Sequence, residues 1–505
     1  GGTPADAGNG AAIGIGTDSD AEFGAVAVDL SNCEREPIHI PGAIQPHGVL
    51  LACRGAELRI VQLSDNAADH LGIEAVGLLG RPIAELFDDA SWQRLQAAAA
   101  AGLPRERNPI ALDSRDRSRS FDGIAHHGPT PDIAIIELEA RSHAPAGFHP
   151  RMRGAVRQLQ GARSLVELYD AAAREVRALT GFDRVMVYRF DADWNGEVVA
   201  EARDDRLETF LGLHYPAADI PAQARRLYTL NWLRIIPDIG YRPSPLLRVA
   251  GEPATPPLDL SFAVLRSVSP IHVEYLSNMG VTASMSVSLL RDGELIGLIA
   301  CHHYSGPHHI AHIVRDSAEF FGQALSWHIA SFEARETAER TLATHHAERR
   351  IVEAIEAAAS LPEGLCTPAL LQLTGADGAC VRYEGRIRRV GRTPDDDAMP
   401  AIVAALAGDA DGWLHATDHL AKRLPQAAAW DDVAAGVIAL EISRARRVRA
   451  VVSPRQRAQR RLGRRPAQAR GGRRRRRAAA VAARLLRAVA RDGARALAAM
   501  AAVAD

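Results

Sequence analysis

Cysteine is scarce in this sequence, long apolar runs are missing, and both features narrow the class of protein. The chain has 5 cysteines in 505 residues, widely spaced and without a CxxC pair. That usage excludes a disulfide framework and favours a reducing, cytoplasmic compartment. No uncharged run of about 18 apolar residues occurs, so we expect no membrane-spanning helix. Lysine is almost absent, since Lys422 is the only one, and this indicates base-composition bias in the gene.

The charges nearly cancel, but they are unevenly placed along the chain. The 60 basic and 61 acidic residues give a net charge of −1, so the whole molecule is not drawn to nucleic acid or to an anionic membrane. Residues 444–505, in contrast, hold 20 arginines, two acids and no aromatic side chain.

The length and the changes of pattern predict several domains of the α+β class. At ordinary domain sizes the chain is long enough for three or four domains. The expected divisions are a disordered leader at 1–25, a small α+β domain at 26–140, a second mixed domain at 141–325, a long helix at 311–358, a third mixed domain at 340–443 and an Arg/Ala-rich tail at 444–505.

Periodicity in the second domain predicts antiparallel strands with flanking helices. Helices are expected between 153 and 180, strands at 185–190, 196–203, 283–290 and 294–304, and a long Pro- and Arg-containing loop at 225–257. Asp292-Gly293 separates the last two strands and suits a tight primed hairpin turn.

One long helix is predicted at 311–358 from a single apolar stripe. Phe321, Leu325, Ile329 and Phe332 recur at spacings of four, four and three, and charged residues fill the other faces. Pro362 and Gly364 come directly after this pattern and end it.

The first segment with chemical interest runs from Cys33 to Leu51. Its sequence, CEREPIHIPGAIQPHGVLL, places a thiol beside charged residues, followed by three prolines and two glycines. Such a segment favours a fixed irregular path over a helix. Taken alone, such a segment is more often the ordinary start of a domain in which the cysteine is incidental.

Three later segments add charged and polar groups. They are HYPAADIPAQARR at 214–226, SVSPIHVEYLSNMGV at 267–281 and ACHHY at 300–304. His302 and His303 are unsuited to sharing a metal ion, because neighbouring residues of a strand point to opposite faces. The thiol, cations, hydroxyls and imidazoles together suit a large, mostly apolar ligand that carries carboxylates and N–H groups.

The order and spacing of seven motifs resemble the bacterial phytochromes. The motifs are CEREPIHIPGAIQPHG, FDRVMVYRF, GEVVAEAR, YPAADIPAQAR, LYTLNWLR, SPIHVEYLSNMGV and GLIACHH, within Ser31–Glu333. The resemblance implies PAS-like and GAF-like antiparallel sheets with flanking helices. It assigns 26–140 to a PAS domain with the attachment segment, 141–325 to a bilin-binding GAF domain, and 340–443 to an incomplete, GAF-related PHY domain beyond the long connecting helix. It also implies that the segment around Ile44 threads through the loop at 225–257.

The resemblance assigns the pigment and its central contacts. Cys33 corresponds to the thiol that adds to the A-ring vinyl group of biliverdin. Plant and cyanobacterial relatives use a cysteine directly before the conserved GAF histidine, where this chain has Ile271. Asp219, followed by Ile220 and Pro221, corresponds to the aspartate whose carbonyl receives the pyrrole N–H groups. His272 would exchange the proton, and His302 would bond the D-ring carbonyl.

The same resemblance assigns the rest of the pocket. Arg234 and Arg266 would hold one propionate, and Ser269, Ser284 and Ser286 would surround the other. The wall of the D ring would consist of Met186, Tyr188, Phe210, Tyr215, Tyr228 and Tyr275. Taken one at a time, these aromatic residues are also what a plain GAF core would contain.

The implied function is red/far-red light sensing by photoisomerisation at C15=C16 of the bilin. We expect a homodimer through GAF and long-helix faces, no membrane or nucleic-acid partner, and no enzymatic activity, because kinase motifs are missing. An output domain or response regulator is not identified. Two alternatives stay open: the sensory part of a light-regulated histidine kinase, and a light-independent GAF regulator that binds a cyclic nucleotide or haem. The latter leaves Cys33 and the propionate arginines without a purpose.

The resemblance stops near Ser443. The family continues through a tongue with a Pro-Arg-x-Ser-Phe motif, whereas Ser453-Pro454-Arg455-Gln456 does not match it. A frameshift near codon 444 in a GC-rich gene would produce such a segment. A real basic tail that binds nucleic acid or anionic lipid is the alternative.

Overall fold

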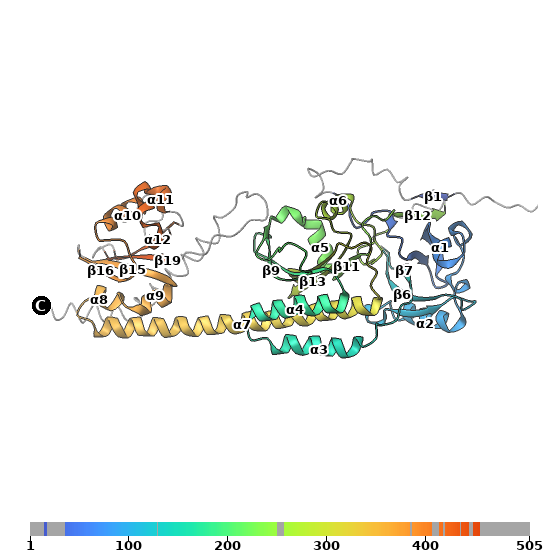
Figure 1. Cartoon of the computed structure of the whole chain (residues 1–505), viewed down its shortest axis with the longest axis horizontal. Coiled ribbons are helices and arrows are strands. Elements are labelled where there is room, and N and C mark those ends of the chain that lie inside the picture. The colour runs from blue at the N-terminus through green and yellow to red at the C-terminus, as the bar shows by residue number, and fades with distance from the viewer. Residues whose placement is uncertain are drawn as a thin grey trace, which may run out of the picture. The chain divides into compact units, whose positions relative to one another are not determined.

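A computed structural model describes most of the chain (Figure 1). The described residues are 15–17, 36–128, 130–249, 257–383, 386–406, 414–417, 420–434, 436–443 and 448–454. Cys33, most of the expected leader and the arginine run at 473–477 lie outside them. The chain divides at Phe332 into two compact units, which are described separately below.

The first sheet of the N-terminal unit is built mainly from residues 43–140. Its strands are β2 (Ala43–Ile44), β3 (Val49–Arg54), β4 (Arg59–Ser64), β5 (Ile110–Asp113), β6 (Ser120–His127) and β7 (Ile133–Ala140), joined by β1 (Ile15–Thr17) and β12 (Ser244–Val249) in the order β1-β12-β4-β3-β7-β6-β5, with β2 on β12. The helices α1 (Ala67–Leu71) and α2 (Asp89–Ala100) flank it. The carboxylate of Asp88 caps α2 by accepting from the Ser91 N–H at 2.9 Å.

The second sheet follows the sequence prediction closely. It contains β8 (Arg184–Phe190), β9 (Gly196–Arg203), β10 (His214–Tyr215), β11 (Leu233–Ile236), β13 (Ala283–Arg291) and β14 (Glu294–His303) in the order β10-β9-β8-β14-β13-β11. The hairpin prediction is confirmed: Asp292 and Gly293 join β13 and β14 with φ angles of 53° and 79°, the left-handed values that a primed turn requires.

Several short and medium-length helices accompany this sheet. They are α3 (Phe148–Gly161), α4 (Leu165–Thr180), α5 (Ala222–Leu230) and α6 (Pro270–Asn278). The predicted helices at 153–180 are thus confirmed as a pair. Ser164 caps the start of α4, and Gly181, with φ of 75°, ends it in the left-handed conformation.

The two faces of the second sheet differ in character. One face carries fully buried apolar side chains such as Val187, Val287 and Ile299. The long helix packs against this face, because a Cβ on Gly322 would lie 2.6 Å from a methyl of Val287. The other face is covered by α5, whose Tyr228 carbonyl accepts a hydrogen bond from the Ser288 hydroxyl at 2.7 Å.

The prediction of a single long loop at 225–257 was wrong in part. The structure places most of α5 there, together with β11 and β12. Prolines and arginines suggested a loop, but Leu233, Ile235 and Ile236 are buried in pairing with β13. β12 comes from the second domain but belongs to the first sheet, where it pairs with β4.

The N-terminal segment near Ile44 lies between two parts of the second domain. On one side, the Leu246 N–H donates to the Gly42 carbonyl at 2.9 Å; on the other, the Gln45 N–H donates to the Leu265 carbonyl at 2.7 Å. The Gln45 amide also donates to the Ile235 carbonyl at 3.0 Å. These contacts agree with the expected threading of this segment.

The long helix is confirmed as α7 (His312–Ala357). Beyond it, the C-terminal unit has a sheet with the order β16-β15-β19-β18-β17. Its elements are α8 (Leu361–Leu365), α9 (Pro368–Thr374), β15 (Ala376–Tyr383), β16 (Arg386–Gly391), α10 (Ala398–Leu406), β17 (Leu414–Thr417), α11 (Leu420–Arg423), α12 (Asp431–Ala434), β18 (Val437–Ser443) and β19 (Val448–Pro454).

The last strand of this sheet shows that the folded region extends beyond the expected boundary at residue 443. The composition changes after Ser443, yet β19 lies beyond it and pairs with both β15 and β18. A short apolar run such as Val451 and Val452 is enough to form a strand, even in a segment that is rich in arginine. Within the described residues, no helix is long and apolar enough to cross a membrane.

Candidate functional site

The polar face of the second sheet brings together several residues singled out from the sequence. In the strand register, Arg234 of β11 lies opposite Ser286, and Ser284 lies opposite His302. Met186 of β8 is in the same row as Ser286, through Ala300. Because directly opposed residues share one face of a sheet, these side chains form two neighbouring rows on that face.

Two arginines stand at one end of this face without an acidic partner among the described residues. The Arg234 guanidinium donates to the carbonyl of Val264 at 3.2 Å, and that of Arg266 donates to the carbonyl of Ile38 at 2.6 Å. The Nε of Arg266 is buried and has no hydrogen-bond partner in the described part. Burial lowers the pKa of Arg234, and lowers that of Arg266 to about 9. Guanidinium groups that have lost contact with water are suited to an anionic ligand, because its oxygens would accept the hydrogen bonds that water no longer accepts.

Two imidazoles, His302 on β14 and His272 on α6, have pKa values low enough to be neutral at pH 7. Burial, and then the charge of Arg184, lowers the pKa of His302 to about 3. Burial, and then Arg234, lowers the pKa of His272 to about 4. The Nδ1 of His302 is buried without a hydrogen-bond partner among the described residues. A neutral imidazole offers one donor and one acceptor, so His302 retains capacity for a ligand.

The predicted aspartate sits on a short turn that faces α6. Asp219 ends a 3-10 helix at Ala217–Asp219, and its carboxylate accepts a hydrogen bond from the Tyr275 hydroxyl. Burial raises the pKa of Asp219 more than this hydrogen bond lowers it. Tyr275 in turn stacks on His272, with ring centroids 6.2 Å apart and planes 14° apart. Asp219, Tyr275 and His272 therefore form one connected group.

An aromatic cluster borders that group. The rings of Tyr188 and Tyr215 are 5.9 Å apart, and the Arg184 guanidinium lies 3.7 Å from the centre of the Phe210 ring. Gly196 makes room for this arrangement, since a Cβ there would lie 1.7 Å from the Tyr188 ring. The expected wall residues of β8 and β10 are thus together.

Two of the predicted residues make contacts that the sequence did not indicate. Tyr228 interacts electrostatically with Arg234 and Arg266. The Ser269 hydroxyl, expected beside a propionate, donates to the Glu36 carboxylate at 2.6 Å. Nothing in the sequence singles out Glu36 for this contact.

The remaining predicted residues flank the turn. Ile220 and Pro221 follow Asp219, are partly buried and lead into α5. Arg184 was missed, although an arginine inside the apolar strand FDRVMVYRF was a visible signal. It is 2% exposed, contacts the Glu201 carboxylate and lies directly opposite His302 in the sheet.

Comparison with known proteins identifies this architecture. Family models match at residues 33–141 (PAS fold), 164–331 (GAF domain) and 344–460 (phytochrome region). The Stigmatella aurantiaca phytochrome photosensory core module is 44% identical with a TM-score of 0.67, covering 84% of this chain and 86% of that one. The chain belongs to the bacteriophytochrome family. A bacteriophytochrome from R. palustris is 41% identical, with a TM-score of 0.69 and the same coverage.

Curated bacteriophytochromes and their relatives are longer than this chain. Cyanobacterial phytochrome B of Nostoc sp. is 42% identical over 428 residues, which are 83% of this chain and 57% of that protein. The bacteriophytochrome of Xanthomonas campestris pv. campestris is 38% identical over 426 residues, 81% of this chain and 66% of that protein. What is matched here is a PAS–GAF–PHY photosensory module, and the phytochrome-region match extends past Ser443 to residue 460.

The neutral histidines predict how stability should depend on pH. Their pKa values are lower in the folded state than the usual 6.5, so the unfolded chain binds more protons below pH 6.5, and acid favours unfolding. For buried His302 alone the loss is about 2 kcal/mol between pH 6.5 and pH 5. Urea unfolding of the pigment-free protein at the two pH values measures this loss in the free energy of unfolding. The His302→Asn variant should lose less stability between pH 6.5 and pH 5 than the wild type. Equal losses in the two proteins would contradict the assignment.

Proposed function

We propose that this chain is a red/far-red photoreceptor that binds biliverdin covalently through Cys33. The observation that carries the proposal is a set of polar groups on one face of the GAF sheet. Among the described residues, buried Arg266 and partly buried Arg234 form no ion pair, and a buried His302 nitrogen has no hydrogen-bond partner. Biliverdin offers two propionates and a terminal carbonyl, which fit these groups. When bound, the bilin supplies light absorption and isomerisation about its C15=C16 bond.

Residues near the start of the described segment support Cys33 as the attachment point. The carboxylate of Glu36 contacts Ser269, and the carbonyl of Ile38 contacts Arg266. Three residues of extended chain span at most about 11 Å, so the chain connection to Glu36 is short enough for a thiol at position 33 to react with a pigment held at the site. The other thiols of the first unit, Cys53 and Cys301, are fully buried, and burial raises the pKa of each. They are poor nucleophiles.

The proposed mechanism assigns three tasks to the chain. Arg234 and Arg266 hold and orient the carboxylates of the pigment. The Asp219 carbonyl and neutral His272 accept pyrrole N–H groups and stabilise their protonated state. His302 Nδ1 and the aromatic cluster border the part of the pigment that rotates. A change at Asp219 would pass to Tyr275 through their hydrogen bond.

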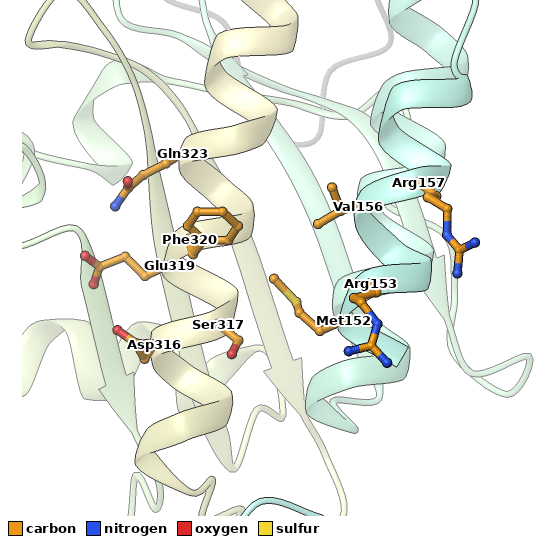
Figure 2. Close-up of a pocket in the computed structure, with 9 residues that line it drawn as sticks. All are labelled: Met152, Arg153, Val156, Arg157, Asp316, Ser317, Glu319, Phe320 and Gln323. Carbon is orange, nitrogen blue, oxygen red and sulfur yellow. The ribbon is translucent and has the colours of Figure 1, made fainter. Parts of the chain in front are cut away.

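We also propose a homodimer through a groove between α3 and α7. The groove is about 820 Å³ in volume, and Figure 2 shows Met152 and Val156 of α3 facing Phe320 of α7. Phe320 is 55% exposed, and Trp327 on the same helix is 76% exposed. Exposed apolar side chains with charged residues around them are typical of an interface between subunits.

The dimer proposal predicts the effect of one substitution. Phe320→Glu places a charge at the centre of the apolar groove, so the protein should become monomeric, with a dissociation constant raised at least about 100-fold. Sedimentation velocity over a concentration series measures this. Val76→Glu, at a 42% exposed apolar site on the 3-10 helix Ala75–Gly77 of the first domain, is the control and should stay dimeric. A dimeric Phe320→Glu protein would refute this interface.

The deciding experiment for function is co-expression with a haem oxygenase, followed by absorption spectroscopy and zinc fluorescence on a denaturing gel. A red-absorbing, zinc-fluorescent protein that photoconverts supports a photoreceptor. A protein that binds haem or a cyclic nucleotide but no bilin would favour the light-independent GAF regulator. Whether an output kinase follows in a longer form is a separate question, and we propose no enzymatic activity for this chain.

A further inference from the structure

Arg225 links the Asp219 turn to another part of the GAF domain. It lies on α5, and its Nη1 donates to the Ile220 carbonyl at 2.6 Å and to the Ala217 carbonyl at 3.3 Å. These two carbonyls stand on either side of Asp219 in the chain. The guanidinium thus holds the backbone that carries Asp219 from both sides.

This turn has little backbone hydrogen bonding of its own. Pro216 and Pro221 bracket it, and neither has an N–H to donate. The 3-10 turn is closed by one described backbone bond, from the Asp219 N–H to the Pro216 carbonyl at 3.1 Å. Hydrogen bonds from a charged donor are stronger than those between neutral groups. The two bonds from Arg225 therefore contribute much of the stability of this turn.

The guanidinium is itself braced by an aromatic ring. Its carbon lies 4.7 Å from the centre of the Trp194 ring, in the loop between β8 and β9. Trp194 has φ of 62°, and Asp191 fixes this loop by accepting from the N–H groups of Asp193 and Asn195 at 2.8 and 3.0 Å. Planar guanidinium groups stack on such rings, and an ammonium group does so less well.

We propose that Arg225, braced by Trp194, is a positioning residue that sets the orientation of Asp219 toward the pigment. This rests on the proposed function, in which Asp219 acts on the pyrrole N–H groups. Arg225 acts on the backbone of the turn and not on the carboxylate. The pKa of the Asp219 carboxylate is shifted by burial and by the hydrogen bond from Tyr275. Without Arg225, pigment attaches as before, but the Asp219 carbonyl is held less firmly where the N–H groups need it.

The test compares two charge-matched variants of the holoprotein. Arg225→Gln removes the brace, and Arg226→Gln removes a neighbouring, exposed arginine of the same helix. Titration of the absorption spectrum of attached biliverdin should show its pKa lowered by about one unit in Arg225→Gln, a tenfold change in proton affinity, and unchanged in Arg226→Gln. The yield of photoproduct should fall severalfold in Arg225→Gln alone, while the fraction of covalently attached pigment stays equal.

Three further variants separate positioning from folding. Arg225→Lys keeps the charge without the fork and should give part of the shift, Trp194→Ala should give a smaller shift in the same direction, and Trp194→Phe should titrate like the wild type. If Arg225→Gln titrates like Arg226→Gln, the inference is overturned. If it does not fold, a wild-type titration of Arg225→Lys overturns it. A wild-type protein that binds no biliverdin refutes the proposed function itself.

Discussion

Replacing Cys33 with serine is expected to abolish covalent pigment attachment completely. A hydroxyl is a far weaker nucleophile than a thiolate at neutral pH, so the serine should form no covalent bond to the pigment. Zinc fluorescence after denaturing electrophoresis should disappear, whereas the native protein should retain noncovalent biliverdin through Arg234 and Arg266. The native spectrum should shift, because the A-ring vinyl group is no longer consumed.

Cys301→Ser is the matched control for this prediction. Cys301 is on β14, 0% exposed, and its side chain lies on the apolar face of the GAF sheet next to His302. It should keep the fluorescent band at wild-type intensity. A band that persists in Cys33→Ser and vanishes in Cys301→Ser would show that the attachment site is misassigned.

His272→Ala is expected to leave pigment attached but to disturb its proton. His272 is a neutral acceptor beside Asp219 and Tyr275, and removing it takes away a group that stabilises the protonated pigment. The pKa of bound biliverdin should fall by about two units, a hundredfold change in proton affinity. Absorbance titration between pH 6 and pH 10 measures this, and photoconversion should be impaired while fluorescence rises.

The control for His272 is another imidazole of the same domain. His303 follows His302 on β14, and its Nδ1 lies 3.1 Å from the Asp183 carboxylate, away from the predicted site. His303→Ala should therefore titrate and photoconvert like the wild type. Normal switching of His272→Ala at pH 9 would rule out the proton-exchange role.

The strands and the long helix were predictable because their signals are local. Alternating apolar residues place β8, β9, β13 and β14 within one residue of their expected ends, and Asp292-Gly293 fixes the hairpin between the last two. The stripe at Phe321, Leu325 and Ile329 likewise set α7. Such patterns depend on neighbours in the chain, so one sequence is enough to find them.

Partners far apart in the chain could not be predicted in the same way. Glu36 and Ser269 meet across 233 positions, and nothing in either segment signals the other. The sequence around β12 gives no local signal for a strand, because its partner, β4, belongs to a different domain. The motif resemblance supplied the candidate site residues, but only the fold shows which of the described ones have buried atoms without a hydrogen-bond partner.

The pairing of β12 with β4 makes the PAS and GAF domains inseparable in practice. β12 contributes Leu246, which is fully buried among Ile44, Leu50 and Ile135 of the first sheet. A GAF domain expressed alone would therefore display an unpaired apolar strand, which is a template for aggregation. Recombination between genes at the PAS–GAF boundary would cut through this shared core. The two domains must then be inherited, folded and engineered as a single piece, even though the chain between them looks like an ordinary linker.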